Sequence, residues 1–153
     1  MRIAEELRFL ILAAQREGNR VLAQALKPFG VTPSQAEVLR LLQERQPLTL
    51  NGLGALLVCE SGSSPSRLVD RLTTTGLIDR LPADHDRRQV RLTLTPEGAR
   101  IATRIAEIED ELYDRLDTAG AGSDTGEVIG FLHRFVDGLP AGRALAHRKE
   151  TGA

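Results

Sequence analysis

The chain has 153 residues, of which 41% are hydrophobic, 27% are charged and 3% are aromatic, and its formal net charge is −1. This composition is typical of a globular protein and excludes disorder as the default state. The scarcity of aromatic side chains argues against stacking on single-stranded nucleic acid. The near-neutral charge argues against coating nucleic acid by bulk attraction.

The first half of the chain has the apolar spacing, capping residues and helix-breaking residues of successive helices. Apolar residues at three- and four-residue steps predict a long amphipathic helix over residues 3–26. Thr32, with Gln35 three residues later, predicts the capping box of a second helix. Thr49 is expected to cap a short third helix, and a fourth helix follows a Ser/Gly/Pro-rich turn and ends at Gly76.

Beyond this fourth helix the apolar period changes from 3.6 to 2. This change predicts two strands, over residues 77–81 and 90–95, joined by the turn "PADHDRR". Val90, Leu92 and Leu94 are expected to face the core. The order helix, helix, helix, hairpin is that of a helix-turn-helix with a β-hairpin wing.

The last third of the chain is again predicted to be helical. Thr95 followed by Pro96 indicates the start of a long helix that extends to about Leu116, and an apolar pattern predicts a final helix over residues 127–139. Residues 141–153 are polar and are expected to form a flexible tail. The predicted fold class is therefore mainly α with a small β-hairpin.

The stretch "DHDRRQVRLTLTPEG" places two arginines at the tip of the predicted wing. From Arg67 to Arg91 the chain carries six Arg and four Asp, a local charge of +2. A helix-turn-helix inserts its second helix into the DNA major groove. An arginine on a thin tip can enter a narrow minor groove, and Asp86 lies close enough to Arg88 to brace it. The alternative is that Arg87 and Arg88 only solvate a turn.

The segments "RLVDRLTTTGLIDR" and "DHDRRQVRLTLTPEG", with the flanking long helices, resemble the MarR family of bacterial winged helix-turn-helix transcriptional regulators. The resemblance covers roughly residues 2–139. It implies a recognition helix over about 63–75 and terminal helices that interlock two subunits. The sequence departs from the family at "CESGSSPSR", where relatives often carry a bulkier polar or basic residue near Gly62.

With this resemblance the chain divides into four segments within one structural domain. They are an N-terminal dimerisation helix (1–30), a winged helix-turn-helix DNA-binding region (31–95), C-terminal linker and dimerisation helices (96–140) and a flexible tail (141–153). The resemblance implies a homodimer that binds double-stranded DNA at a pseudo-palindromic operator. We expect a repressor that a small-molecule effector releases, with no cofactor.

The predicted DNA-binding residues lie on the recognition helix, at its start and on the wing. Serines at a helix start can also serve only as caps, and Arg67 and Arg71 flank Asp70, so surface salt bridges are the alternative for them. Asp84 and Asp86 are expected to brace the wing arginines. The predicted DNA-binding set is Ser61, Ser63, Ser64, Ser66, Arg67, Arg71, Arg87 and Arg88.

Candidate sensing residues are few. Cys59 lies near the turn before the recognition helix, where oxidation would add polar bulk and make the protein a thiol-based redox sensor. The alternative is a small buried filler. Arg16, Arg20 and Tyr113 are candidates for an effector pocket, or else belong to a solvated face. His85 lacks the converging ligands of a metal site.

Two further function classes are an enzyme and a protein-interaction module. Neither a nucleophile motif nor a phosphate-binding loop is found, so no enzyme is predicted. A winged-helix protein-interaction module without a DNA target remains an alternative to the DNA-binding regulator. The apolar run near the N-terminus, only about six residues, is too short for a membrane span, and we expect a soluble cytoplasmic protein.

Overall fold

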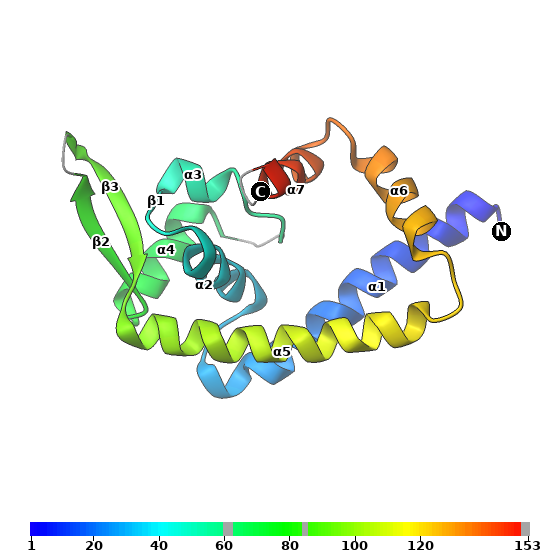
Figure 1. The fold of residues 1–153 in the computed structure, drawn as a ribbon, viewed down its shortest axis with the longest axis horizontal. Coiled ribbons are helices and arrows are strands. Elements are labelled where there is room, and N and C mark those ends of the chain that lie inside the picture. The colour runs from blue at the N-terminus through cyan, green and yellow to red at the C-terminus, as the bar shows by residue number, and fades with distance from the viewer. Residues whose placement is uncertain (60–62, 84–85, 151–153) are drawn as a thin grey trace.

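The computed structural model describes residues 1–59, 63–83 and 86–150, the last range without the side chains of residues 86–88. Helix α5 (Pro96–Gly120) runs the length of the molecule (Figure 1). The other elements, in chain order, are α1 (Ile3–Leu26), a single 3₁₀ turn (Lys27–Phe29), α2 (Pro33–Arg45), β1 (Leu48–Thr49), α3 (Leu50–Gly54), α4 (Pro65–Thr74), β2 (Ile78–Ala83), β3 (Asp86–Leu94), α6 (Thr125–Val136) and α7 (Pro140–Glu150).

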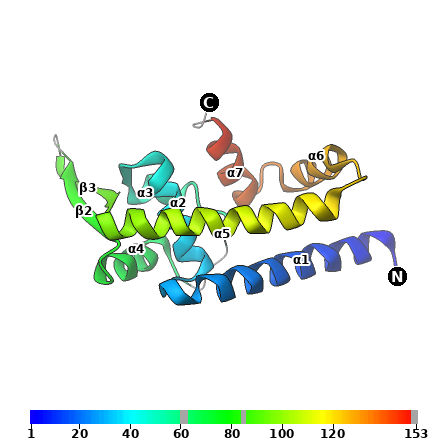
Figure 2. The ribbon, with the colours of Figure 1, turned by 60° about the horizontal axis from the view of Figure 1, so that its bottom comes forward.

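The elements gather at two ends of α5. Helices α2 to α4 and the three strands form one end, which we call the compact end, while α6 and the first turns of α1 lie at the other (Figures 1 and 2). The winged-helix prediction is confirmed. Helix α1 also has the predicted bounds. Among the described residues, no helix is both long and apolar enough to cross a membrane.

Helix starts follow the local signals of the sequence. Thr32 Oγ1 accepts a hydrogen bond from the Gln35 amide (3.2 Å) while the Thr32 amide donates to Gln35 Oε1 (3.0 Å), which completes the predicted capping box. Thr49 and Thr95 cap α3 and α5 by accepting a hydrogen bond from the amides of Gly52 and Gly98, both at 3.0 Å. Such caps each stabilise a helix by about 1 kcal/mol.

The hydrophobic core belongs to the compact end. It joins α2, α3 and α4 to the sheet and to the first turns of α5, with each of its largest side chains almost fully buried. Burial of each such side chain contributes roughly 1.5–3 kcal/mol. These side chains include Leu26, Leu39, Leu42, Leu53, Leu72, Ile78, Leu92 and Ile105.

The sheet has three antiparallel strands in the order β1-β3-β2. Leu48 of β1 pairs with Leu92, and Ile78 of β2 pairs with Leu94. The two-residue strand β1 is too short to leave a sequence pattern and was not predicted. Leu92 is buried as predicted, but Val90 is 40% exposed because β2 and β3 extend beyond the core as a wing. The inward orientation predicted for Val90 is therefore wrong.

The C-terminal segment differs from the predicted flexible tail. Residues Pro140–Glu150 form α7, which lies beside α3 in Figure 1. Ala144 is buried, and Arg148 Nε donates to the Leu56 carbonyl oxygen (2.7 Å). The polar composition of this segment suggested solvent exposure, but its charged groups bind backbone and side-chain atoms of the compact end.

Gly98 of α5 lies against the backbone of Leu77, the residue just before β2. A Cβ at this position would lie 2.0 Å from the Leu77 carbonyl oxygen. We expect Gly98→Ala to lower the free energy of unfolding by about 3 kcal/mol, because the backbone must move to relieve the clash. Urea denaturation measures this loss, and Gly54→Ala, which meets only ordinary contacts, is the matched control. Equal stability of the two variants would contradict this packing.

Candidate nucleic-acid interface

Helix α4 has one buried face and one exposed polar face. Leu68, Val69 and Leu72 point into the core. Ser64 caps the helix by accepting a hydrogen bond from the Arg67 amide (3.3 Å). The exposed face carries the described members of the predicted DNA-binding set on and before this helix, which are Ser63, Ser64, Ser66, Arg67 and Arg71.

The two arginines of α4 have no acidic partner within the described part of the chain. Asp70, which lies between them in the sequence, instead pairs with Arg80 of β2. Among the described residues the structure therefore gives Arg67 and Arg71 no salt bridge to Asp70, and the surface salt-bridge interpretation stays an untested alternative. Because Asp70 pairs with Arg80, it does not neutralise the two guanidinium groups of α4.

The wing projects from the same end of the molecule as α4 (Figures 1 and 2). Leu81 of β2 and Val90 of β3 are both exposed, so this part of the hairpin lies outside the hydrophobic core. Arg87 and Arg88 lie in β3, and their side chains lie outside the described residues, as does that of Asp86. Bracing of the wing arginines stays a prediction. Ser61, Asp84 and His85 also lie outside the described residues.

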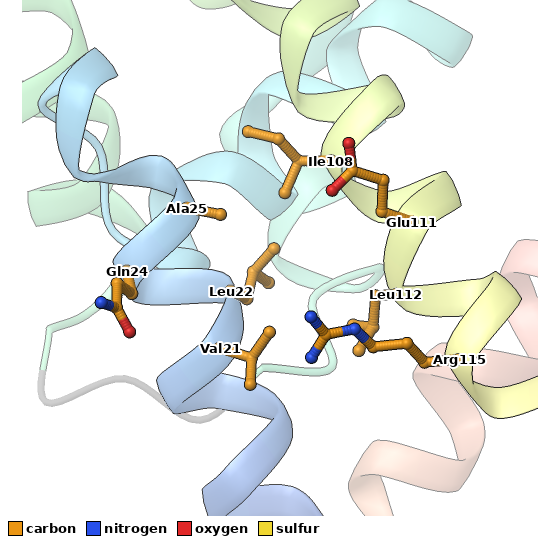
Figure 3. A pocket seen from close by; sticks show the side chains of 8 residues that line it. All are labelled: Val21, Leu22, Gln24, Ala25, Ile108, Glu111, Leu112 and Arg115. Atoms are coloured by element: carbon orange, nitrogen blue, oxygen red, sulfur yellow. The ribbon is translucent and has the colours of Figure 1, made fainter. Parts of the chain in front are cut away.

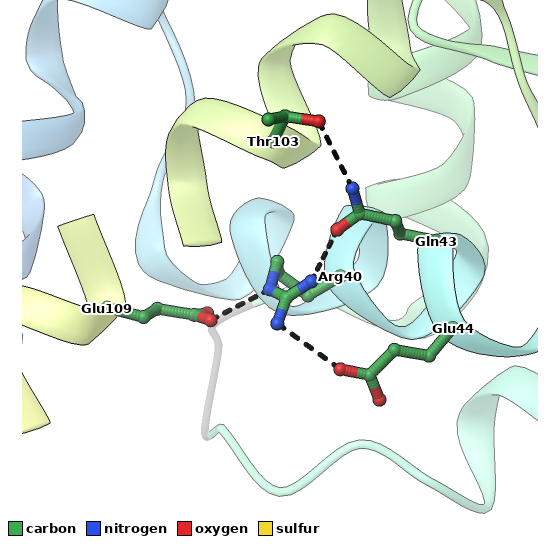
Figure 4. Close-up of polar contacts among 5 residues, drawn as sticks. All are labelled: Arg40, Gln43, Glu44, Thr103 and Glu109. Atoms are coloured by element: carbon green, nitrogen blue, oxygen red, sulfur yellow. Dashed lines mark hydrogen bonds and ion pairs between the residues drawn. The ribbon is translucent and has the colours of Figure 1, made fainter. Parts of the chain in front are cut away.

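A polar cluster fastens α2 to α5. Arg40 Nε donates to Glu109 Oε2 at 2.8 Å, and Arg40 also pairs with Glu44 of its own helix at 3.3 Å (Figure 4). Gln43 Nε2 donates to Thr103 Oγ1 at 3.3 Å. Burial alone would lower the pKa of Arg40, but the hydrogen bond and charge of Glu109 outweigh burial and raise it. The orientation of the compact end on α5 therefore has a charged as well as an apolar basis.

Cys59 is exposed, so the interpretation as a buried filler is wrong. Its pKa is nevertheless raised to about 11, first by partial desolvation of the thiol and then by the nearby Glu37 carboxylate. The thiol is therefore protonated at neutral pH. Reactive cysteines instead have a lowered pKa beside positive charges.

The three predicted effector-pocket residues do not meet in one cavity. Arg16 and Arg20 line a groove on α1, and Arg20 pairs there with Glu17. Tyr113 lines a separate cavity of about 300 Å³ between α1, α2, α5 and α7. The residues that line this cavity with Tyr113 could not be predicted from the sequence, because they come from segments that are distant in the chain. They include Leu22, Arg40, Cys59, Glu109, Leu112 and Arg148.

Another cavity, of about 320 Å³, separates α1 from α5. In Figure 3, Leu22 of α1 and the Arg115 guanidinium of α5 point into the space between the two helices. Its remaining lining is a mixture of apolar and charged side chains. Among the described residues, no three His, Cys, Asp or Glu side chains converge as a metal site would require.

Large apolar side chains are exposed at the end of the molecule opposite the wing. On α6 and just after it, Val128, Ile129, Phe135 and Leu139 are each at least half exposed. Helix α1 adds a second exposed apolar group, which comprises Ile3, Phe9, Leu10 and Leu12. So many large apolar side chains exposed on two helices indicate an interaction site rather than ordinary solvent-facing helix.

Comparison with known proteins places these features in a family. A sequence profile of the MarR family matches residues 29–89. The organic hydroperoxide resistance transcriptional regulator of Bacillus subtilis (strain 168) is 31% identical over 108 residues, which cover 71% of this chain and 73% of that protein.

Solved structures share the fold over most of the chain. A mutant MarR from E. coli complexed with operator DNA has a TM-score of 0.72 at 26% identity, covering 90% of this chain and 99% of that one. The MepR–DNA complex of S. aureus has a TM-score of 0.77 at 23% identity, covering 91% and 99%, a likeness of fold alone. The chain belongs to the MarR family and has its winged helix fold.

Proposed function

We propose that this chain is a DNA-binding transcriptional regulator that places α4 in the major groove and the tip of its wing in the flanking minor groove. The observation that carries this proposal is the exposed face of α4, where Arg67 and Arg71 have no internal partner among the described residues. Phosphate oxygens and guanine base edges are the DNA groups that arginine binds best. The similar MarR structure is a complex with operator DNA, which supports DNA as the ligand of this chain.

The distribution of charge agrees with this use of the compact end. The chain is nearly neutral, but the stretch from Arg67 to Arg91 has a surplus of positive charge. A local surplus steers a duplex toward α4 and the wing without attracting nucleic acid over the rest of the surface. Ser64 and Ser66, at the start of α4, add small hydroxyl groups suited to phosphate contacts.

A second copy of the chain is the natural cover for the apolar faces of α1 and α6. Monomeric proteins rarely leave an apolar surface of this extent exposed. A twofold dimer built on these helices would present two α4 helices to one side of a duplex. Operators read in this way have half-sites about one helical turn, roughly 34 Å, apart. We therefore propose a homodimer that recognises a pseudo-palindromic site.

Regulation by a small molecule would use the cavity beside Tyr113. This cavity lies between the compact end and α5, and the Arg40–Glu109 pair forms part of its wall. A ligand that binds there and separates the pair would change the angle between α2 and α5. Such a change would move the two α4 helices out of register with successive grooves, so ligand binding would release the operator and relieve repression.

Substitution of Arg71 tests the proposed DNA contact. Arg71→Ala is expected to lower affinity for the duplex upstream of the protein's own gene about tenfold, in the range of roughly 1–3 kcal/mol for a lost base contact. Fluorescence anisotropy at several salt concentrations measures this loss. Arg104→Ala, which removes the same charge from an exposed position on α5, is the control. Equal binding by both variants would reject α4 as the recognition helix, and absence of wild-type binding would favour the protein-interaction module.

Substitution of Phe135 tests the proposed dimer. Phe135 is 63% exposed on α6, and Phe135→Glu would place a carboxylate in the proposed interface. Analytical ultracentrifugation is expected to find a dimer for the wild type and a monomer for this variant. Leu81→Glu, on the exposed wing, should leave the dimer intact. A monomeric wild type would exclude the proposed twofold arrangement.

The pKa of Cys59 provides a test of the thiol-sensor alternative. A rise from 9 to about 11 lowers the thiolate fraction near pH 8 about a hundredfold. The greater nucleophilicity of a more basic thiolate recovers about tenfold of this loss. Iodoacetamide should therefore label Cys59 at pH 8 about ten times more slowly than N-acetylcysteine, with a rate that rises until about pH 11. If Cys59 is labelled faster than N-acetylcysteine, the result would favour the thiol-sensor alternative.

A further inference from the structure

The segment that leads from α3 toward α4 is held by two charged side chains rather than by regular secondary structure. Glu37 of α2 accepts a hydrogen bond from the Val58 amide at 2.8 Å and another from the Cys59 amide at 2.9 Å. Arg148 of α7 donates from Nε to the Leu56 carbonyl oxygen at 2.7 Å. Together these two side chains satisfy three backbone groups of residues 56–59, which we call the connecting segment.

The two side chains also pair with each other. The Arg148 guanidinium forms an ion pair with the Glu37 carboxylate, and the Glu37 side chain is only 10% exposed. Arg45 of α2 donates to the Arg148 carbonyl oxygen at 2.6 Å, which fixes the end of α7 from the opposite direction. A carboxylate this poorly solvated depends on its partner cation, because removal of one member leaves a buried uncompensated charge.

The connecting segment lies directly upstream of the recognition helix. Ser64, the N-cap of α4, follows Cys59 by five positions. Leu68, Val69 and Leu72 hold α4 in the core, and the connecting segment fixes the chain five residues before the N-cap of this helix. Because the chain is continuous, a fixed backbone five residues before the N-cap limits how far the exposed start of α4 can move.

We propose that Arg148 is a positioning residue for DNA recognition, which acts through Glu37 and the connecting segment on α4. The inference rests on the proposed function and extends it: a side chain of the C-terminal helix, outside the winged helix-turn-helix, sets the geometry with which that unit meets DNA. Arg148 itself does not touch the duplex in this arrangement. Its loss should lower discrimination between DNA sequences more than it lowers attraction to phosphate.

The experiment compares full-length wild type with Arg148→Ala and with Arg148→Lys, a conservative variant whose ammonium cannot reproduce the planar fork of donors. Lys149→Ala is the matched control, because it removes the same charge from the adjacent position of α7, where Lys149 contacts His133. Amide hydrogen exchange of Val58 and Cys59 is measured without DNA. Affinities for the upstream duplex and for a scrambled duplex of equal length are then measured over a range of salt concentrations.

We expect exchange at Val58 and Cys59 to accelerate at least tenfold in Arg148→Ala, less in Arg148→Lys and not in Lys149→Ala. Affinity for the upstream duplex should fall about tenfold in Arg148→Ala, with affinity for the scrambled duplex and the salt slope unchanged. The salt slope is the change in the logarithm of the binding constant with the logarithm of the salt concentration. Loss of one phosphate contact would reduce the size of this slope by about one, so an unchanged slope indicates that no phosphate contact is lost.

Three results would overturn the inference. Unchanged exchange at Val58 and Cys59 in both Arg148 variants would show that Arg148 does not hold the connecting segment. Faster exchange with undiminished binding of the upstream duplex would show that the connecting segment does not position α4. A reduced salt slope would make Arg148 a direct DNA contact. If the wild type itself binds neither duplex, the proposed function fails and this inference fails with it, an outcome distinct from the other three.

Discussion

Helix α2 is held between α5 and the rest of the compact end by two kinds of contact. Leu39 and Leu42 are fully buried in the core that α2 shares with α4, the sheet and the start of α5. On its other side Arg40 pairs with Glu109 of α5. Apolar burial supplies most of the stabilising free energy but is non-directional, whereas a hydrogen-bonded ion pair has a defined geometry. The position of α4 and the wing relative to the long helices depends on this combination.

The molecule separates two surfaces of different chemistry by the length of α5. One end exposes the arginines of α4 and the projecting wing, and the other exposes the apolar residues of α1 and α6. An apolar surface excludes water most effectively against another apolar surface, while guanidinium groups bind anions best when no internal carboxylate competes. The near-neutral net charge of −1 conceals this division, because the acidic residues of α5 offset the basic stretch from Arg67 to Arg91.

Much of the fold follows from short-range signals, and some of it does not. The bounds of α1 and the caps at Thr32, Thr49 and Thr95 were predictable because a helix start depends on residues within one turn of each other. Strand β1 escaped prediction because two residues cannot display a period. The tail was predicted as flexible because its polar residues have no periodic apolar face, yet α7 docks through individual hydrogen bonds to atoms distant in the sequence, among them the Leu56 carbonyl oxygen.

The sequence by itself determined the winged-helix order of elements, the exposed serines and arginines of α4 and the family to which the chain belongs, because each of these depends on local periodicity or a local motif. Only the tertiary structure decided that Asp70 pairs with the wing, that Cys59 is exposed beside Glu37 and that Tyr113 shares a cavity with Arg148 rather than with Arg16. These pairings join residues that lie 10 to 35 positions apart in the sequence. No short-range pattern records them, since they arise from how the helices cross once the core has formed.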